Sequence, residues 1–280
     1  MSKFRGPLLL LSMFLLAGNA FAQDVAEFPV IKDLPPAATL PADGVWDIRG
    51  VALGATVPET LTALKAINPS REPEVKRGTL GLRDDRGNTI AFTYTTSMSQ
   101  ELNNPDGSME YYYVFFSTNA LTERATKIER RIVYSGAQNQ GSFIELQAAL
   151  LSKYGKETLK YKPYLNEIYY IWFDGKRIAL TRQQMDSMRY QPGTPANCAE
   201  MFQDPGTYQL RQPRLPGHKG CTAGLKIVVQ PGARDDLISQ VTFIAFDNER
   251  DWQGSVATDA FLLGELDKKT KAKTGSAPKL

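Results

Sequence analysis

The sequence predicts an α+β fold made of two tandem units, each a helix followed by a four-stranded antiparallel sheet, with the helices packed on one face. Two observations lead to this prediction. A capped amphipathic helix occurs twice, and each time two β-rich runs joined by a Gly-containing turn follow it. The expected caps Thr56 and Ser142 are 86 residues apart, and the turn glycines Gly87 and Gly175 are 88 apart. Helix plus hairpin is therefore the expected internal repeat.

The helix expected at Ser142 to Lys156 has a recognisable start, face and end. Ser142 and Glu145 have the S-x-x-E spacing of a capping box, in which the serine oxygen accepts a bond from a free backbone N–H and the glutamate reaches back to the cap. Gly155 can adopt the left-handed conformation that ends a helix. Apolar residues recur at helical spacing at Phe143, Leu146, Leu150 and Tyr154. One face of this helix is expected to be buried.

The first helix repeats this pattern. Thr56 and Glu59 have the capping-box spacing, and Pro58 lies in the first turn, where its missing N–H leaves no hydrogen bond unmade. Its apolar positions are Leu61, Leu64 and Ile67. Asn68-Pro69 ends the helix. Because Leu64 and Leu150 each lie about two turns past a cap, they are expected to occupy equivalent core positions.

A β-hairpin is expected after each helix. The first, Thr79 to Thr96, turns around Gly87, and the second, Ile168 to Arg182, turns at Asp174-Gly175, a dipeptide that suits a type I′ turn. A further pair of strands completes each sheet. These pairs are Glu110 to Ser117 with Thr126 to Ser135, and Thr222 to Gln230 with Leu237 to Asp247. Val45 to Val51 is expected to form a short strand that leads into the first helix.

The amino end has the features of a secretory signal peptide. Two cations precede an apolar run from Leu8 to Ala17, and a small-residue cleavage motif ends at Ala22. The run breaks at Gly18-Asn19, short of the roughly 20 apolar residues that a membrane span needs. Cleavage is expected before Gln23. This predicts a periplasmic or secreted protein whose mature chain has no stable membrane span.

The net charge gives no reason to expect nucleic-acid binding. The chain carries 33 Lys and Arg against 30 Asp and Glu. Residues 1–22 contribute two of the cations and no anion, so their removal lowers the net charge from +3 to +1.

The expected domain boundaries follow from these segments. In order, they are a signal peptide 1–22, a Pro-rich linker 23–44, a first unit 45–136, a second unit 137–250, and a C-terminal helix with a basic tail, 251–280. Within this last segment Val256 to Leu266 is expected to form the helix, and the tail that follows is too poor in apolar residues to pack. The second unit contains a long insertion, 183–220, rich in Pro, Gly and Gln; structureless loops of that length are uncommon unless they are functional or tethered. Cys198 and Cys221 are expected to form one disulfide that tethers it, with two free thiols as the alternative.

Two helix-plus-meander copies in an exported chain resemble the tandem architecture of the β-lactamase inhibitor protein family. Each copy also resembles the small lipoprotein of the outer-membrane β-barrel assembly machinery. The likeness is carried by Leu53-Gly54-Ala55-Thr56 with Glu59 and Leu64, and by Lys153-Tyr154-Gly155 at the end of the second helix. It covers most of residues 45–247 and implies the two-unit architecture.

No motif in the sequence commits the chain to an enzymatic chemistry. G-x-S-x-G, H-E-x-x-H and phosphate-binding glycine loops are absent from it. The single histidine, His218, has no cluster of ligands at metal-binding spacing nearby, so neither a metal nor another cofactor is expected. Asp84 and Asp85 occupy an expected turn, where aspartate is favoured for backbone reasons. The chain is therefore expected not to be an enzyme.

Strand alternation predicts which residues share a face of the sheet. The residues expected to pack on the helices are Leu80, Leu82, Ile90, Phe92, Ile178, Leu180, Leu225 and Ile227. Their neighbours form an expected open, cationic face of Arg83, Thr93, Thr95, Lys127, Arg131, Arg177, Thr181 and Lys226. Tyr112 and Tyr169 are expected to anchor a partner there, because tyrosine and arginine are enriched in interface hot spots. A solvated face with extended arginines is the alternative.

These features favour an exported protein-binding or accessory module. Its expected partner is a protein of acidic character in the envelope or secreted space, bound through the open face of the sheet. The alternative is an enzyme that acts on a cell-envelope polymer, with its site near the insertion 183–220.

Overall fold

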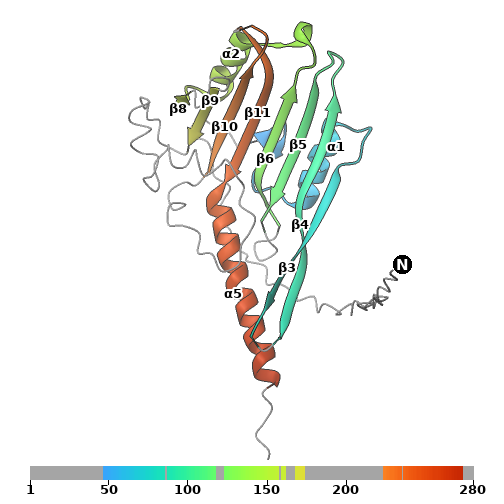
Figure 1. Cartoon of the computed structure of the whole chain (residues 1–280), viewed down its shortest axis with the longest axis vertical. Helices are drawn as coiled ribbons and strands as arrows, with labels where there is room; N and C mark the ends of the chain where they lie inside the picture. The colour runs from blue at the N-terminus through green and yellow to red at the C-terminus, as the bar shows by residue number, and fades with distance from the viewer. Residues whose placement is uncertain are drawn as a thin grey trace, which may run out of the picture.

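The computed structural model describes residues 47–85, 87–117, 123–157, 159–161, 168–173, 223–234 and 236–273. These residues form one large antiparallel sheet, a small two-stranded sheet and three α-helices (Figure 1). The expected signal peptide, linker and insertion lie outside the described residues, as do Arg177, Cys198 and Cys221.

The large sheet has nine strands. Eight lie side by side in the order β3 (Glu74–Arg83), β4 (Thr89–Asn103), β5 (Met109–Phe116), β6 (Ala125–Val133), β11 (Leu237–Asp247), β10 (Ala223–Pro231), β9 (Ile168–Phe173) and β8 (Leu159–Tyr161). The ninth, β7 (Gly141–Ser142), pairs with the start of β11. Every pair in the sheet is antiparallel.

The prediction of two tandem helix-plus-sheet units is wrong, because strands from both halves of the chain form a single sheet. β6 and β11 pair in register from Val133↔Gln240 to Lys127↔Phe246. Two separate sheets would leave both strands as edges with unpaired backbone groups, and their pairing satisfies those groups. Alternation along a strand shows which residues share a face. It does not show which strands become neighbours, so the sequence pattern missed this junction.

The first expected hairpin is confirmed, and the second is wrong in its pairing. β3 and β4 pair from Arg83↔Thr89 onward, beside a turn in which Gly87 has a φ of 81°. β9 instead pairs with β8 on one side and with β10 on the other. Both of its edges are occupied from Tyr169 to Ile171, so no edge is left there for the expected partner strand. The turn expected at Asp174-Gly175 lies outside the described residues.

Both predicted helix starts are present. In α1 (Val57–Ile67), Thr56 Oγ1 accepts a bond from the Glu59 N–H, and the Glu59 carboxylate accepts one from the Thr56 N–H at 2.7 Å, which completes the capping box. In α2 (Phe143–Tyr154), the cap hydroxyl of Ser142 accepts a bond from the Glu145 N–H at 3.3 Å. Gly155 ends α2 with a φ of 71°. A short 3-10 turn, η2 (Ala137–Asn139), precedes α2.

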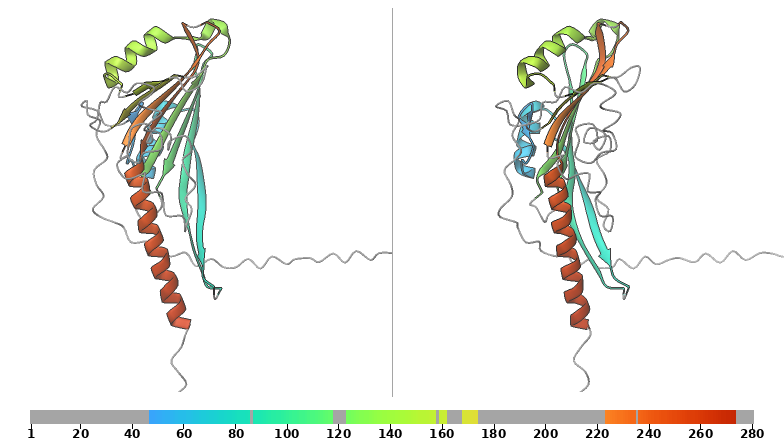
Figure 2. Two further views of the ribbon diagram at one scale, coloured as in Figure 1. Left: turned by 60° about the vertical axis from the view of Figure 1, so that its left-hand side comes forward. Right: turned by 90° about the vertical axis from the view of Figure 1, so that its left-hand side faces the viewer.

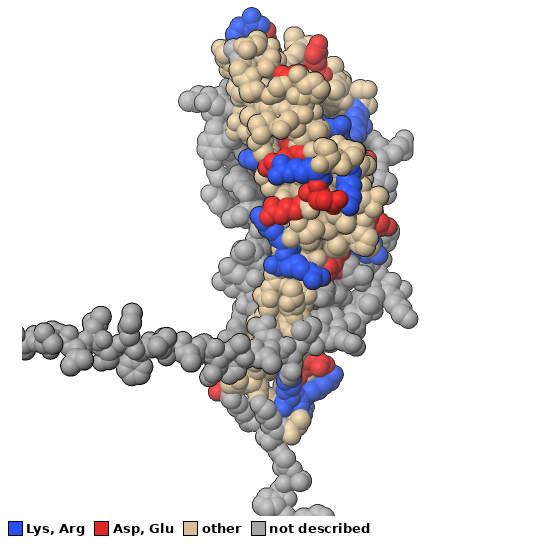
Figure 3. Space-filling model, turned by 90° about the vertical axis from the view of Figure 1, so that its right-hand side faces the viewer, with Lys and Arg blue, Asp and Glu red and all other residues tan. Residues whose placement is uncertain are grey.

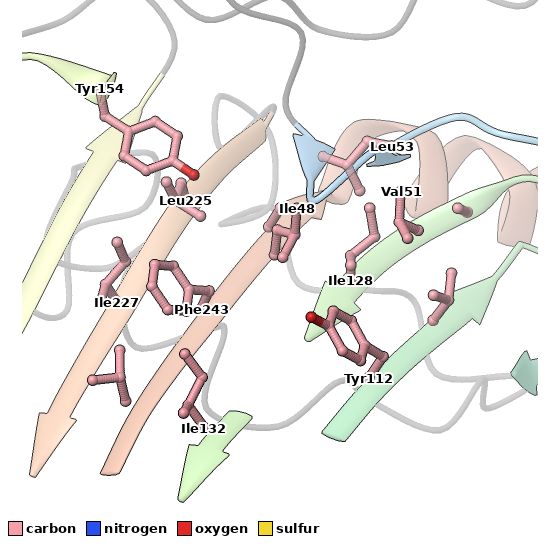
Figure 4. Close-up of a cluster of buried hydrophobic side chains, with 14 of the residues drawn as sticks. Ile48, Val51, Leu53, Tyr112, Ile128, Ile132, Tyr154, Leu225, Ile227 and Phe243 are labelled. Carbon is pink, nitrogen blue, oxygen red and sulfur yellow. The ribbon is translucent and has the colours of Figure 1, made fainter. Parts of the chain in front are cut away.

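The main core lies on the side of the sheet that carries α1 and α2 (Figure 2). Leu64 of α1 and Leu150 of α2 are both buried in it, as their equivalent positions predicted. The short strand expected before α1 is a small hairpin of β1 (Asp47–Ile48) and β2 (Val51–Ala52). Figure 4 shows its Ile48 and Val51 lying over Ile128 of the sheet. The hairpin therefore acts as part of the cover on this face.

α5 (Asn248–Lys273) is much longer than the helix expected within Val256 to Leu266, and it includes residues expected to form an unpacked basic tail. It lies beside the distal part of β3 and β4, which extends past the level where β4 pairs with β5 (Figures 1 and 2). The helix and this two-stranded ribbon bury apolar side chains against each other. They are Leu82, Ile90, Phe92, Leu262 and Leu266.

Candidate functional site

The face of the sheet opposite α1 and α2 carries a group of aromatic and charged residues on two neighbouring strands. The three pairs are Tyr111↔Arg131, Tyr113↔Glu129 and Phe115↔Lys127, with β5 named first and β6 second. Their neighbours in sequence point into the main core, so by alternation these six point away from it. We call these six residues the outer strip.

Cations of the outer strip lie over its aromatic rings. The guanidinium carbon of Arg131 is 4.9 Å from the centroid of the Tyr111 ring, and Lys127 Nζ is 5.2 Å from the centroid of the Phe115 ring. Lys127 Nζ also lies 3.5 Å from a carboxylate oxygen of Glu129. Cation–π attraction at these distances holds the long side chains against the rings. Tyr111 and Arg131 are each half-buried, so part of each remains accessible.

The structure brings only part of the predicted site together. Lys127 and Arg131 are neighbours in the outer strip, but Arg83 is not near them. Arg83 pairs with Thr89 at one end of β4. Lys127 pairs with Phe115, which pairs with Ser97, so Lys127 lies level with a position much farther along β4. Eight residues of extended chain separate the two levels, a distance of roughly 26 Å. The predicted cationic face is therefore not one continuous site.

Tyr112 is wrongly assigned to the open face. Its side chain is 0% exposed and points into the main core (Figure 4). Tyr111 and Tyr113 take the outward positions. The run Tyr111-Tyr112-Tyr113 hides its own alternation, and the polar residue before it, Glu110, is itself buried, so the sequence pattern does not mark which tyrosine points into the core.

Tyr169 occupies the same row across the sheet as Arg131. The row runs from Arg131 through Thr242 and Val228 to Tyr169. The two positions are three strands apart, or about 14 Å at the usual spacing between strands. The strand pairings relate Tyr169 to the outer strip through backbone register alone.

The accessible part of this face is narrower and less cationic than expected. Lys226, predicted to lie on it, is only 3% exposed, and Thr95 is buried as well. Away from this face, Figure 3 shows acidic and basic side chains interspersed on the side of the molecule that it views. Ion pairs elsewhere among the described residues include Lys65 with Glu72, Arg71 with Glu101, and Lys76 with Glu74.

A second group of polar residues lies on the opposite, core-facing side of the sheet. We call it the Glu110 cluster; it comprises Arg49, Asn104, Glu110, Tyr112 and Arg130. Glu110 Oε2 accepts bonds from Arg130 Nε at 2.8 Å and from Arg49 Nη1 at 3.2 Å. Its Oε1 accepts a bond from Asn104 Nδ2 at 3.0 Å, and the Tyr112 hydroxyl donates to Oε2. The sequence does not predict this cluster, because its members come from separate turns and strands.

The cluster fixes the protonation of its two central groups. Burial raises the pKa of Glu110, but the hydrogen bonds from Arg130 and Tyr112, the charge of Arg130 and the bond from Asn104 together lower it to about 2. Burial raises the pKa of Tyr112, and the neighbouring Glu110 adds to this against the opposing charge of Arg130, which gives about 12. At neutral pH the carboxylate is charged and the phenol is protonated.

This chemistry makes the Glu110 cluster a structural connection. A carboxylate with a pKa of about 2 is a poor proton acceptor near neutral pH, where a general base needs a pKa close to the working pH. Its oxygens are also already occupied by donors from the protein. The cluster instead holds the β1–β2 turn, in which Arg49 has a φ of 53°, against the sheet.

Three further observations concern the described part of the chain. No three His, Cys, Asp or Glu side chains gather there as a metal site would require. None of its helices combines the length and the apolar character needed to cross a bilayer. Asp84 has the backbone role expected of it, because its Oδ1 accepts a bond from the Asn88 N–H at 2.7 Å in the turn.

Comparison with known proteins finds no family model, no curated protein and no solved structure that matches this chain. The resemblance drawn from the sequence therefore rests on the short motifs that carry it.

Proposed function

We propose that the chain is an exported protein-binding module whose partner contacts the outer strip. The observation that carries this proposal is the Tyr111–Arg131 pair, in which a half-buried arginine lies over a half-buried tyrosine ring and part of each stays accessible. Tyrosine and arginine are the residue types most enriched among the hot spots of protein interfaces. Side chains already held against each other lose less conformational entropy on binding. Export rests on the signal-peptide features of residues 1–22.

The charges of the outer strip indicate the kind of surface that it binds. Glu129 lies beside Lys127 and offsets its charge, which leaves Arg131 as the cation most available to a partner. A planar guanidinium on a tyrosine ring suits a carboxylate flanked by apolar surface. The proposed partner surface is therefore acidic and partly apolar, and its association should weaken as salt rises.

Arg131→Glu tests this proposal. A photo-crosslinking residue placed at Tyr113 in the exported protein identifies the partner, and calorimetry with the purified partner measures the affinity. The variant should bind roughly tenfold more weakly or worse, because a repulsive charge replaces an attractive one at the contact. Its melting temperature should stay close to that of the wild type, since partly exposed charges contribute little to stability.

Arg234→Glu is the matched control. Arg234 is also an arginine with an acidic neighbour, Asp236 at 2.8 Å, but it is exposed in the turn between β10 and β11, away from the outer strip. The control should retain full affinity. Unchanged binding by Arg131→Glu would refute the outer strip as the contact surface.

A further inference from the structure

β3 is an edge strand with one open side. In the described structure it pairs with β4 on one side and with no strand on the other. Its register with β4 shifts between Lys76 and Arg77, and it is regular from Gly78 to Arg83. An edge of this kind presents backbone N–H and C=O groups that another extended chain can pair with.

The direction of these backbone groups can be assigned residue by residue. The Asp84 N–H donates to the Asn88 carbonyl at 3.0 Å, so the backbone of Asp84 points toward β4. Direction alternates along an antiparallel strand. The backbone groups of Gly81 and Thr79 therefore point toward the open side. Both residues are small and exposed, so a second backbone can approach them closely.

α5 lies beside this edge with a fixed rotation. Thr270 Oγ1 donates to Asp84 Oδ2 at 2.8 Å and accepts a bond from Asn88 Nδ2 at 3.3 Å, so Thr270 lies over the turn between β3 and β4. Lys269 Nζ donates to the Thr89 carbonyl at 3.4 Å, on β4. Lys269 therefore marks the β4 side of the helix, and the flank beyond Thr270, about 100° further round, lies on the β3 side.

The flank of α5 on the β3 side carries exposed apolar residues. Leu263 and Val256 precede Thr270 by seven and fourteen residues, which is about two and four helical turns, so they follow the same flank. Leu263 is 56% exposed and Val256 is 47% exposed. A chain added beside β3 would place alternate side chains against this flank.

We propose that the open edge of β3 and this flank of α5 form a docking groove for an extended, acidic segment of a partner polypeptide, which binds as an additional strand. Backbone pairing with Thr79 and Gly81 supplies affinity, and the apolar flank of α5 selects side chains on one face of the segment. This groove is separate from the outer strip, and the proposal does not rest on the function proposed above.

The charges of β3 favour an acidic partner over a second copy of the chain. Lys76, Arg77 and Arg83 outnumber Glu74, the one acidic residue of the strand. Two copies paired antiparallel about Leu80 would set Arg77 of one opposite Arg83 of the other, and like charges across strands are destabilising. Arg77, Thr79 and Gly81 share the face away from α5, because Leu82 packs on the helix. The ligand should therefore alternate apolar residues toward α5 with acidic residues away from it.

A labelled nine-residue peptide of alternating valine and glutamate is the probe. Its affinity for the full chain is measured by fluorescence anisotropy. A valine–lysine peptide and a valine–glutamate peptide interrupted by proline are the peptide controls, and both should bind roughly tenfold more weakly or worse. In the bound wild type, hydrogen exchange should slow at the amides of Thr79 and Gly81, which point outward.

Thr79→Pro and Thr79→Ala form a matched pair of variants. Both lose the hydroxyl that lies 3.4 Å from Thr93 Oγ1, but only proline removes the outward N–H. Proline is tolerated on an edge strand where its missing N–H faces solvent. Thr79→Pro should bind the probe roughly tenfold more weakly than Thr79→Ala, since one backbone bond is lost and the ring obstructs pairing. Leu263→Glu on the exposed flank should also weaken binding of the probe. This variant tests the groove if the proline variant fails to fold.

Three outcomes would overturn the proposal. These are equal affinity of the two Thr79 variants, no binding of the probe by the wild type, and a wild-type dimer that Thr79→Pro dissociates, which would make a second copy the occupant. Neither Thr79 nor Leu263 belongs to the outer strip, so failure here leaves the Arg131 experiment unaffected.

Discussion

At the scale of single residues, the carboxylate of Glu110 joins parts of the chain that are far apart in sequence. It binds Arg49 of the β1–β2 turn, Asn104 after β4 and Arg130 of β6. The guanidinium of Arg130 also lies 5.4 Å from the ring centroid of Phe243. Without the carboxylate of Glu110, the guanidinium of Arg130 would remain beside the rings of Tyr112 and Phe243 without the negative charge that it pairs with. Removing one member of a buried ion pair is costly for that reason.

Glu110→Gln should therefore lower the free energy of unfolding by about 3 kcal/mol. The substitution keeps the size of the side chain and removes its charge, so the loss reports on the ion pairs. Urea denaturation measures it. Glu101→Gln is the control, because Glu101 pairs with Arg71 at an exposed site, where an ion pair contributes less than about 1 kcal/mol. Equal losses in the two variants would contradict a structural role for the Glu110 cluster.

The pH dependence of the same variant gives an independent check. The pKa of Glu110 is lowered from 4.5 to about 2 by folding, so its contribution to stability is fully present above pH 4.5. It is lost as the pH falls toward 2, when the folded state must also take up the proton. The difference in stability between the wild type and Glu110→Gln should therefore shrink across this window. A constant difference from pH 7 to pH 2 would refute the lowered pKa.

At the scale of elements, local chemistry in the sequence predicted the helix starts and the first hairpin. Thr56 and Glu59 cap α1 by contacts between residues three apart, and Gly87 turns the hairpin within a few residues. The start of α5 depends on Asp247, which accepts a bond from the Arg250 N–H and forms a buried ion pair with its side chain. A polar first turn of this kind carries no apolar periodicity, so the sequence pattern predicted too late a start for that helix.

α2 offers a direct test of its assigned face, because two neighbouring leucines have opposite environments. Leu150 is buried in the main core, and Leu151 is 57% exposed. Leu150→Ala should lower the free energy of unfolding by about 2–5 kcal/mol, through lost burial and the cavity left behind. Leu151→Ala should change it by less than about 0.5 kcal/mol. Thermal or urea unfolding of both variants measures the difference, and comparable losses would mean that the rotation of α2 is wrong.

At the scale of the whole molecule, the sequence could not predict which strands meet. The junction of β6 with β11 joins residues more than a hundred positions apart, and no local pattern encodes that choice. The candidate site shows the same limit. Lys127 and Arg131 were found because alternation places both on the outward side of β6. Tyr112 was misplaced because its run of aromatic residues hides its own alternation, and the Glu110 cluster was missed because only the tertiary fold assembles it.

A single sheet also predicts a single cooperative unfolding transition. Leu64 of the first half and Leu150 of the second lie in one core cluster with Ile128 of β6 and Val241 of β11. Unfolding either half alone would expose this shared apolar surface and leave a central strand as an open edge. Leu64→Ala should therefore lower the opening free energy of amides in β10 as much as in β5, by about 2–5 kcal/mol. Native-state hydrogen exchange at increasing denaturant measures both regions in one experiment. If the substitution lowered only the opening free energy of β5, the two halves would unfold independently, and the sheet would not act as one unit.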